Sequence, residues 1–468
     1  MVSGMGKETP KRPNGIPADV WADAGGVARD WMTEQARRLG LNSGNSSLPP
    51  SSDRPDATPQ KPGRTPSSRK RGGQPGHQKA ERTLVPTDEC DRVETIKPSH
   101  CRGCGTTLDG HDPDPQRKQV VDLPEVKPIV VEFQSHTLTC RCCGRVNKPS
   151  LPEHVPRGSF GPRVIATVTL LGGLGRLSQR MIARLVGDLF GLTVSDGQIS
   201  RLQRIGRESL QSAYEEITAD VRESAAVNMD ETGWREDGRR TWLWTAVGRL
   251  STLFAVRSSR SRAVMRELLG DDFDGVLISD RYSAYASLPD DRHQFCWAHL
   301  LRDFEAMTER GGDSAVIGRG LKESGRELIH HWNRLQRNEI VRSTFDRNYR
   351  RLRDDIVEAL LDGTNIGDAK TAETCRRLSN HCYSLFAFAH IDGVSPTNNA
   401  AERALRQAVI FRKLSFGTES RSGSKTLAVV MSVIETCRRL GRHALGWITD
   451  AVTHKQQNRP TPTLLPST

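Results

Sequence analysis

The chain has 468 residues, which is enough for several domains, and 26% of them are charged. No apolar run approaches the roughly 18 residues that a membrane-spanning helix needs, and the polar N-terminus lacks the apolar stretch of a signal peptide, so we expect a cytoplasmic protein with no membrane partner. The net charge of +12 favours nucleic acid as a partner, because neutralising phosphates releases condensed counterions.

The N-terminal part of the chain divides into a helix and an arm. Residues 1–41 contain apolar side chains at helical spacing, which predicts a short amphipathic helix. Residues 42–83 are rich in Ser, Pro, Gly and basic side chains and cannot bury enough apolar surface to offset their ordering entropy. We expect a disordered basic arm in which Arg69, Lys70 and Arg71 either contact DNA or belong to a solvated linker.

Residues 84–150 carry two CxxC pairs, each followed by a glycine. The four cysteines are Cys101, Cys104, Cys140 and Cys143. Four thiolates give Zn²⁺ a closed tetrahedral site, and the metal supplies folding energy that a small core lacks. Alternating strands are expected at 119–123 and 129–139, and the distance between the pairs is longer than usual. We therefore predict a small zinc-ribbon-like β domain with structural Zn²⁺, in which Cys142 and His100 are alternative ligands.

Residues 160–222 have a helical pattern. The stretches 177–189 and 195–205, separated by a glycine turn, are typical of two packed helices, with Ser195 or Asp196 as the N-cap of the second. A helix-turn-helix would place that second helix in the DNA major groove, although any packed helix pair gives the same pattern. The side chains that it would present to DNA are Gln198, Arg201, Gln203 and Arg204.

Residues 223–310 alternate between strand and helix patterns. The expected strands are 225–229, 240–250, 252–256, 275–279 and 293–299, and the expected helices are 261–269 and 300–307. Three meandering strands, a helix and a further strand match the order of an RNase H-like α/β core. Asp230 and Asp280 each follow an apolar strand, and two acids in this order are harder to explain as caps than one. Glu231 should point to the opposite face of its strand and is a weaker candidate.

A third carboxylate beside Asp230 and Asp280 would come from a later helix. Glu402 lies near the start of a helix that begins close to Pro396. Because Asn399 precedes it by three residues, Glu402 could close a capping box and bond back to the helix start. The alternative is that Glu402 faces Asp230 and Asp280, and the spacing alone leaves both open.

The stretch between Asp280 and Glu402 is far longer than the strand and helix that an RNase H-like fold requires. Residues 311–392 within it predict helices at 315–336, 344–361 and 371–389. We therefore expect a helical insertion in the catalytic domain that grips DNA or a second protomer. Core helices follow in residues 393–452, and residues 453–468 are expected to form a flexible tail.

Several motifs recur in one order along the chain. They are residues 45–53, Gly-Gly-Gln-Pro-Gly-His at 72–77, both CxxC pairs, and the segments 229–234, 279–285, 397–406, 412–417 and 432–437. From about residue 40 to 450 the chain thereby resembles transposases of the insertion-sequence-66 family. The resemblance implies a DDE-type transposase of multidomain α+β fold in which Asp230, Asp280 and Glu402 are the catalytic acids. Glu435 is the alternative for the third acid.

The implied reaction is metal-dependent cleavage of DNA strands at the ends of a mobile element and their transfer into target DNA. Two Mg²⁺ (or Mn²⁺) ions on Asp230, Asp280 and Glu402 would neutralise charge on the attacking and leaving oxygens. A homodimer or larger assembly on DNA is expected, and accessory proteins of the same element are further candidate partners. The basic residues that could hold phosphates beside the acids are Arg403, Arg406, Arg412 and Lys413.

Alternative interpretations apply to single residues and to the whole chain. For Trp234, Trp242 and Trp244 we expect core packing, with stacking on a flipped base as the alternative. His299 is expected to be structural, although it could orient water or phosphate. The competing functions are a DNA-binding regulator, a nuclease that cuts without joining, and a purely structural zinc protein.

Overall fold

The computed structural model describes residues 21–22, 25, 27–29, 82–152, 155–156 and 158–466. Most of the expected N-terminal helix and basic arm lies outside the described residues, and so do Arg69, Lys70 and Arg71. By its contacts the chain divides into two units, residues 59–128 and the remainder. Within the described part of the chain, no helix combines the length and apolar character needed to cross a membrane.

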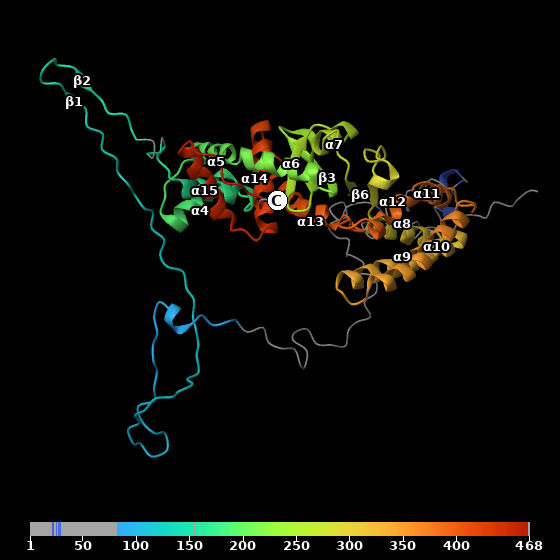
Figure 1. The fold of residues 1–468 in the computed structure, drawn as a ribbon, viewed down its shortest axis with the longest axis horizontal. Coiled ribbons are helices and arrows are strands. Elements are labelled where there is room, and N and C mark those ends of the chain that lie inside the picture. Colours follow the sequence, from blue (N-terminus) through green and yellow to red (C-terminus); the bar gives the residue numbers. More distant parts are fainter. Residues whose placement is uncertain are drawn as a thin grey trace, which may run out of the picture. The chain divides into compact units, whose positions relative to one another are not determined.

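A five-stranded mixed sheet forms the centre of the larger unit (Figure 1). Its strands are β3 (Ala226–Glu236), β4 (Arg239–Val247), β5 (Thr252–Arg257), β6 (Val276–Ser279) and β7 (His293–Phe295). They lie in the order β5-β4-β3-β6-β7, and β4 is antiparallel to both β3 and β5. β6 runs parallel to β3, and β7 runs parallel to β6. The expected order of three meandering strands, a helix and a parallel strand is confirmed.

The predicted ends of two strands differ most from the structure. The first strand was expected to end before Asp230, but β3 continues to Glu236 and pairs Asp230 with Thr245 of β4. The extension exists because Asp237 and Gly238, at φ values of 51° and 70°, form a two-residue hairpin turn whose twist matches that of the strands. The last strand, β7, is also shorter than expected, since α8 (Trp297–Glu309) begins directly after it.

Helices pack against the sheet from both ends of the chain. The helices of this group are α3 (Pro162–Gly173), α4 (Gln179–Phe190), α5 (Asp196–Ser209), α6 (Gln211–Glu223), α7 (Arg262–Leu269), α14 (Arg421–Arg439) and α15 (Ala444–Gln456). They share one apolar core with β3, β4 and β5. The predicted helix pair is confirmed as α4 and α5: α4 ends at Gly191 with φ 65°, and Ser195 caps α5 by accepting a hydrogen bond from the Gln198 N–H at 3.3 Å.

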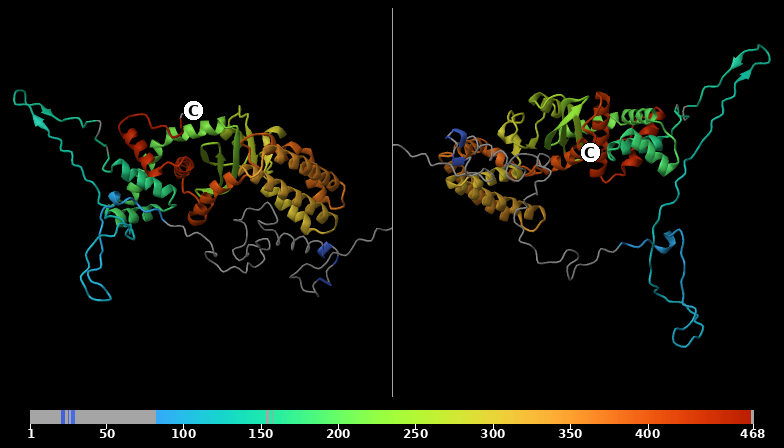
Figure 2. Two further views of the ribbon diagram at one scale, coloured as in Figure 1. Left: turned by 60° about the horizontal axis from the view of Figure 1, so that its bottom comes forward. Right: turned by 180° about the vertical axis from the view of Figure 1, so that it is seen from behind.

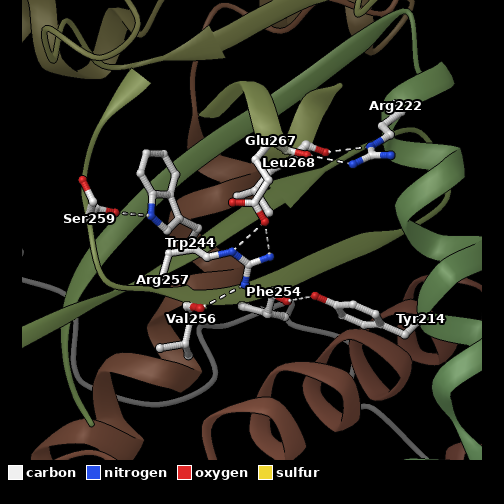
Figure 3. Close-up of polar contacts among 9 residues, drawn as sticks. All are labelled: Tyr214, Arg222, Trp244, Phe254, Val256, Arg257, Ser259, Glu267 and Leu268. Atoms are coloured by element: carbon white, nitrogen blue, oxygen red, sulfur yellow. Dashed lines mark hydrogen bonds and ion pairs between the residues drawn. The ribbon is translucent and has the colours of Figure 1, made fainter. Parts of the chain in front are cut away.

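Polar side chains join α6 and α7 to the sheet edge at β5 (Figure 3). The Tyr214 hydroxyl donates to the carbonyl oxygen of Phe254 at 2.9 Å. The Arg257 guanidinium binds the Glu267 carboxylate at 2.7 and 2.9 Å, and Arg222 donates to the backbone carbonyl of Glu267 at 2.7 Å. These bonds hold the helix that separates β5 from β6 and thereby position β6 beside β3.

The insertion consists of four helices. They are α9 (Gly312–Gln336), α10 (Arg342–Gly363), α11 (Ala369–Asn380) and α12 (Cys382–His390) (Figures 1 and 2). The third predicted helix is divided in two at His381, whose backbone leaves the helical region at φ −119° and ψ 43°. These helices share a core with α8 and β7, and the indole N–H of Trp297 donates to the Leu385 carbonyl at 2.7 Å. The helix α13 (Asn399–Ser415) follows the insertion.

The segment 82–152 has much less β-structure than predicted. No strand forms at 119–123, and the stretch 129–139 contributes only β1 (Leu138–Thr139), which pairs with β2 (Val146–Asn147). The alternation was a misleading signal because no second layer covers it: Ile129 is 92% exposed and Val120 is 83% exposed. The prediction of a β-rich unit is therefore wrong for this segment, and the cysteines of its two CxxC pairs lie in turns.

The residues after α15 are anchored to α6. Leu464 is completely buried in the same core as α6, and the backbone N–H groups of Leu464 and Leu465 each donate to the Glu216 carboxylate at 2.9 Å. The prediction of a flexible tail is therefore wrong for these residues, because Leu464 completes an apolar core and two backbone N–H groups bind Glu216.

Candidate active site

Asp230 lies in the middle of β3, on the face that α13 covers. Two residues earlier on this face, the Asn228 side-chain amide donates to the carbonyl of Thr397 and to the side-chain oxygen of Asn398, both at 3.2 Å. Alternate residues of a strand share a face, so the Asp230 carboxylate points to the same side as Asn228. The first acid is thus close to the start of α13.

Glu231 points to the opposite face, as predicted. Its side chain is 1% exposed, forms an ion pair with Arg260, and accepts a hydrogen bond from the Tyr285 hydroxyl. The Arg260 guanidinium also lies 3.5 Å from the ring centroid of Tyr282. Burial raises the pKa of Glu231, while the Arg260 charge and the Tyr285 hydrogen bond act against this rise. Glu231 is therefore committed to a buried ion pair on its own face of the sheet.

Asp280 is the residue that directly follows β6, as predicted. Its Oδ1 accepts a hydrogen bond from the Tyr282 N–H at 2.9 Å, which holds the carboxylate at the strand end. The parallel register pairs Ala226 with Val276 and Asn228 with Ile278. Continued by two residues, this register brings Asp280 beside Asp230 on the neighbouring strand. Neighbouring strands lie about 4.8 Å apart, so the two acids share one edge of the site.

The start of α13 is fixed to two other elements. The Asn398 side-chain amide donates to the Met229 carbonyl of β3 at 2.8 Å, and its backbone N–H donates to the Cys296 sulfur at 3.2 Å. The Trp297 N–H at the start of α8 donates to the Pro396 carbonyl at 2.9 Å. Asn398 is only 1% exposed. The first turn of α13 is thereby held between β3 and α8.

Glu402 lies one turn into α13 and is not a helix cap. The N-cap is Asn398, and no side chain closes a capping hydrogen bond at this helix start. The Oε1 atom of Glu402 is buried and has no hydrogen-bond partner among the described residues. The capping-box alternative is therefore wrong, because the Glu402 carboxylate does not bond back to the helix start.

The carboxylates of this region act on one another. Burial raises the pKa of Asp230 well above its usual value, and the negative charges of Glu231, Asp280 and Glu402 raise it further. Crowded carboxylates favour either a bound proton or a bound cation. Their oxygens are hard ligands, which fits Mg²⁺ or Mn²⁺.

A second set of ligand atoms overlaps with the acids at Glu402. One atom each of Cys296, His299 and Glu402 lies within 4.8 Å of the others, the only such group of three in the described part of the chain, and it does not include Asp230 or Asp280. Burial lowers the pKa of His299, which favours the neutral imidazole, and raises the pKa of the Cys296 thiol to about 11. Sequence reasoning treated His299 as structural and overlooked Cys296, although the CxxH spacing at a helix start was a usable signal.

Glu435, the alternative third acid, is already paired. Its carboxylate lies 3.0 Å from the Arg438 guanidinium on the same helix, α14. It lines a small cavity with Arg176, Gln407 and Phe411. Glu402 rather than Glu435 acts electrostatically on Asp230.

The basic side chains expected to contact DNA differ in exposure. The exposed ones are Arg201 and Arg204 on α5, and Arg403, Arg406 and Lys413 on α13. Arg204 forms an ion pair with Glu208 at 3.2 Å. Arg412 is partly buried and donates to the Thr232 hydroxyl at 3.1 Å and to the Gly233 carbonyl, so it braces β3.

The tryptophans near Asp230 are largely core residues. Trp234 is 1% exposed and donates its indole N–H to the Thr418 hydroxyl at 3.2 Å, and Trp244 is completely buried. Core packing is thus confirmed for these two. Trp242 is partly buried, with the guanidinium groups of Arg240 and Arg260 at 5.0 and 5.1 Å from its ring.

Both CxxC pairs form the same tight turn. In the first, the Gly105 N–H donates to the Cys101 carbonyl at 2.9 Å, and Gly105 has φ 75°. In the second, the Gly144 N–H donates to the Cys140 carbonyl at 2.9 Å, and Gly144 has φ 72°. Each glycine therefore meets a backbone requirement that L side chains rarely satisfy.

One thiol in each turn has a lowered pKa. Hydrogen bonds from the side chain and backbone of Thr106 lower the pKa of Cys104 to about 7. Backbone N–H groups of Cys143 and Cys142 lower the pKa of Cys140. Zinc binds the thiolate form of cysteine, so the lowered pKa values of Cys104 and Cys140 favour metal binding.

Comparison with known proteins gives consistent family matches. The family model for the transposase IS66 family matches residues 157–426. The family model for the zinc-finger binding domain of transposase IS66 matches residues 98–144. A family of unknown function matches residues 25–83.

Three similar proteins come from Sinorhizobium fredii (strain NBRC 101917 / NGR234). Uncharacterized protein y4qI is 27% identical over 409 residues, covering 79% of this chain and 72% of the relative. Uncharacterized protein y4hP is 24% identical over 402 residues, covering 78% and 72%. Uncharacterized protein y4jD is 24% identical over 297 residues, covering 56% of each chain.

Proposed function

Since the chain belongs to the IS66 transposase family, we propose that it is a DDE-type enzyme that cuts DNA strands at the ends of a mobile element and joins them to target DNA. The observation that carries the proposal is that the charges of Asp280 and Glu402, from distant parts of the chain, both act on the pKa of Asp230. The β3–β6 register brings Asp280 beside Asp230, and the bonds of Asn398 hold the helix of Glu402 against β3. The combined effect of these charges on the pKa of Asp230 supports their proximity.

The sheet supports an RNase H-like core for this enzyme. Three antiparallel strands followed by two parallel ones, in the order β5-β4-β3-β6-β7, are the arrangement that this fold requires. In it, Asp230 comes from the central strand, Asp280 from the end of the adjacent parallel strand, and Glu402 from a later helix. The helices α9–α12 are then an insertion between the second and third acids.

Asp230 and Asp280 would hold the catalytic cations, and Glu402 would complete the ligand set. Two bound Mg²⁺ or Mn²⁺ ions would neutralise charge on the attacking and leaving oxygens of the phosphodiester. The crowded carboxylates provide the oxygen ligands that these ions prefer. Arg403 and Arg406, exposed on the same helix as Glu402, would contact the DNA backbone.

The remaining parts of the chain would bind DNA and hold the assembly. Structural Zn²⁺ would be bound by Cys101, Cys104, Cys140 and Cys143; the glycine turn of each pair and the lowered pKa values of Cys104 and Cys140 support this. Arg201 and Arg204 of α5 would add a second DNA contact. Because joining requires two ends, we expect a dimer or larger assembly on DNA.

The test is a cleavage and strand-transfer assay on paired element ends with Mg²⁺. Asp230→Asn, Asp280→Asn and Glu402→Gln should each abolish both steps, because each removes a charged ligand. The matched control is Glu435→Gln, which also removes a helix carboxylate but leaves the three acids intact, and it should retain both steps. Loss of activity in Glu435→Gln with retention in Glu402→Gln would assign the third acid to Glu435. Cleavage without joining would indicate a nuclease, and DNA binding with neither step would indicate a regulator.

A further inference from the structure

Cys296, His299 and Glu402 bring three different ligand atoms together at the meeting point of α8 and α13. Cys296 is the N-cap residue of α8, and His299 lies in the first turn of that helix. Residues three apart on a helix share a face, so both side chains point toward α13. Glu402 reaches them from the first turns of α13, whose start is bound to Cys296 through the Asn398 N–H.

Two of these atoms are buried without a hydrogen bond. The His299 Nδ1 and Glu402 Oε1 atoms lie 3.8 Å apart, and neither has a hydrogen-bond partner among the described residues. Leaving such groups unsatisfied costs about 1–3 kcal/mol each, so proteins normally pair them. The separation is too long for a hydrogen bond between them.

The same separation suits two ligands of one metal ion. Nitrogen and oxygen ligands lie about 2.1 Å from Zn²⁺, which places them roughly 3.0–3.8 Å apart for bond angles of about 90–130°. The Cys296 sulfur lies within 4.8 Å of the other two ligand atoms, and a bound ion with a Zn–S bond of about 2.3 Å would draw the three atoms closer together. The Asn398 N–H bond to this sulfur would orient it, as outer-shell bonds do in metal sites.

We propose that Cys296, His299 and Glu402 bind a divalent ion of the zinc class. Thiolate and imidazole ligands select Zn²⁺ or Co²⁺ over Mg²⁺, which prefers oxygen ligands alone. Three protein ligands leave a fourth position free for water or for a phosphate oxygen of DNA. The Glu402 side chain is 31% exposed as a whole, whereas its Oε1 atom is buried beside the His299 Nδ1 atom.

This site is separate from the cysteine turns and shares Glu402 with the proposed catalytic acids. Its place in the DNA reaction therefore rests on the proposed function, whereas the binding of the ion does not. The zinc-class ion would hold Glu402 at the edge of the active site. The ions bound by Asp230 and Asp280 would be of a different kind, Mg²⁺ or Mn²⁺.

The test is the number of zinc ions per chain, measured by atomic emission on the full-length protein after zinc loading and desalting. We expect about two ions in the wild type, one in the cysteine turns and one at the new site. The double variant Cys296→Ser/His299→Ala should retain about one ion, and so should Cys101→Ser/Cys104→Ser. Serine at position 296 can still accept the Asn398 N–H bond, which limits damage to the fold.

The matched control is His331→Ala. The His331 side chain is 15% exposed, like that of His299, has a buried Nδ1 without a partner among the described residues, and lies 3.6 Å from Glu327. It belongs to no group of three ligands in the described chain, so its removal should leave both ions bound. Co²⁺ loading of the Cys101→Ser/Cys104→Ser variant gives a second measurement, because a thiolate-to-cobalt absorption band should persist there and vanish on adding Cys296→Ser.

A wild type with a single zinc that disappears in the Cys101→Ser/Cys104→Ser variant would overturn the proposal. An unchanged zinc count in Cys296→Ser/His299→Ala would do the same. Neither outcome depends on DNA cleavage, so the site can fail while the catalytic proposal holds. Conversely, two bound zinc ions in a protein that never cuts DNA would retain the site and reject the proposed function.

Discussion

Replacement of Asn398 by alanine tests whether the start of α13 is held by side-chain bonds to β3. The substitution removes the donor to the Met229 carbonyl at 2.8 Å and the acceptor of the Asn228 amide at 3.2 Å. Each lost bond costs about 1 kcal/mol net, and a buried group left unpaired costs about 1–3 kcal/mol. Asn228 keeps its second acceptor, the Thr397 carbonyl, so we expect a total loss of roughly 2–4 kcal/mol in the free energy of unfolding.

The same substitution should reduce DNA cleavage more than its stability cost explains. Asn398 is the N-cap of the helix that carries Glu402, and a shift of about 1 Å in a catalytic group can lower the rate roughly 100-fold. We also expect a higher Mg²⁺ concentration for half-maximal cleavage, because a displaced carboxylate binds the ion less well. Urea unfolding and a Mg²⁺ titration of cleavage measure the two effects.

The matched control is Ser432→Ala. Ser432 is completely buried and accepts a hydrogen bond from the Phe254 N–H of β5 at 2.8 Å, so its loss also leaves a backbone group of the sheet unpaired. It should destabilise the fold by about 1–3 kcal/mol and leave the Mg²⁺ requirement unchanged. If Asn398→Ala and Ser432→Ala need the same Mg²⁺ concentration, the side-chain bonds of Asn398 do not position Glu402.

Three further substitutions test the site and its support. The pKa of Asp230 is raised above 3.8, so the folded state loses stability as pH rises from about 4 through the raised pKa. Without divalent ions, Asp230→Asn should therefore be more stable to urea than the wild type at pH 8, and the difference should be smaller at pH 4. Equal differences at the two pH values would contradict this. Arg260→Met leaves the Glu231 carboxylate buried without its ion-pair partner and should lower the free energy of unfolding by roughly 3 kcal/mol. Adding Glu231→Gln should restore much of this loss. If the effects of the two substitutions on the free energy of unfolding simply add, the ion pair does not stabilise the fold. Gly206→Ala places a Cβ 2.0 Å from the Thr169 hydroxyl and should cost about 1–3 kcal/mol in thermal unfolding, with partial recovery in Thr169→Ala.

Sequence patterns predicted the elements whose burial follows a regular period. The helix pair α4–α5, with its Gly191 turn and Ser195 cap, and the strand before Asp280 are examples. The continuation of β3 past Asp230 was missed because the residues after it are mostly polar. The turn signal Asp237-Gly238 was present and indicates a hairpin, so pairing with β4 could have been recognised.

Alternation alone predicted strands at 119–123 and 129–139 that do not form. A strand requires a partner and an apolar layer to cover it, and side chains such as Val120 and Ile129 remain exposed. The importance of Asn398 was equally invisible, because its partners Asn228 and Met229 are about 170 positions away in the chain. Only tertiary contacts show that this asparagine binds a strand rather than merely beginning a helix.

The insertion is not an independent spacer between the second and third acids. Its helix α12 accepts the indole N–H of Trp297 at the Leu385 carbonyl, and the backbone N–H of the same tryptophan binds the Pro396 carbonyl immediately before α13. Trp297 is fully buried, so neither bond can be exchanged for water without opening the core. The position of Glu402 therefore depends on how the insertion packs against α8. A partner that displaced α12 would act on the third carboxylate through this one residue.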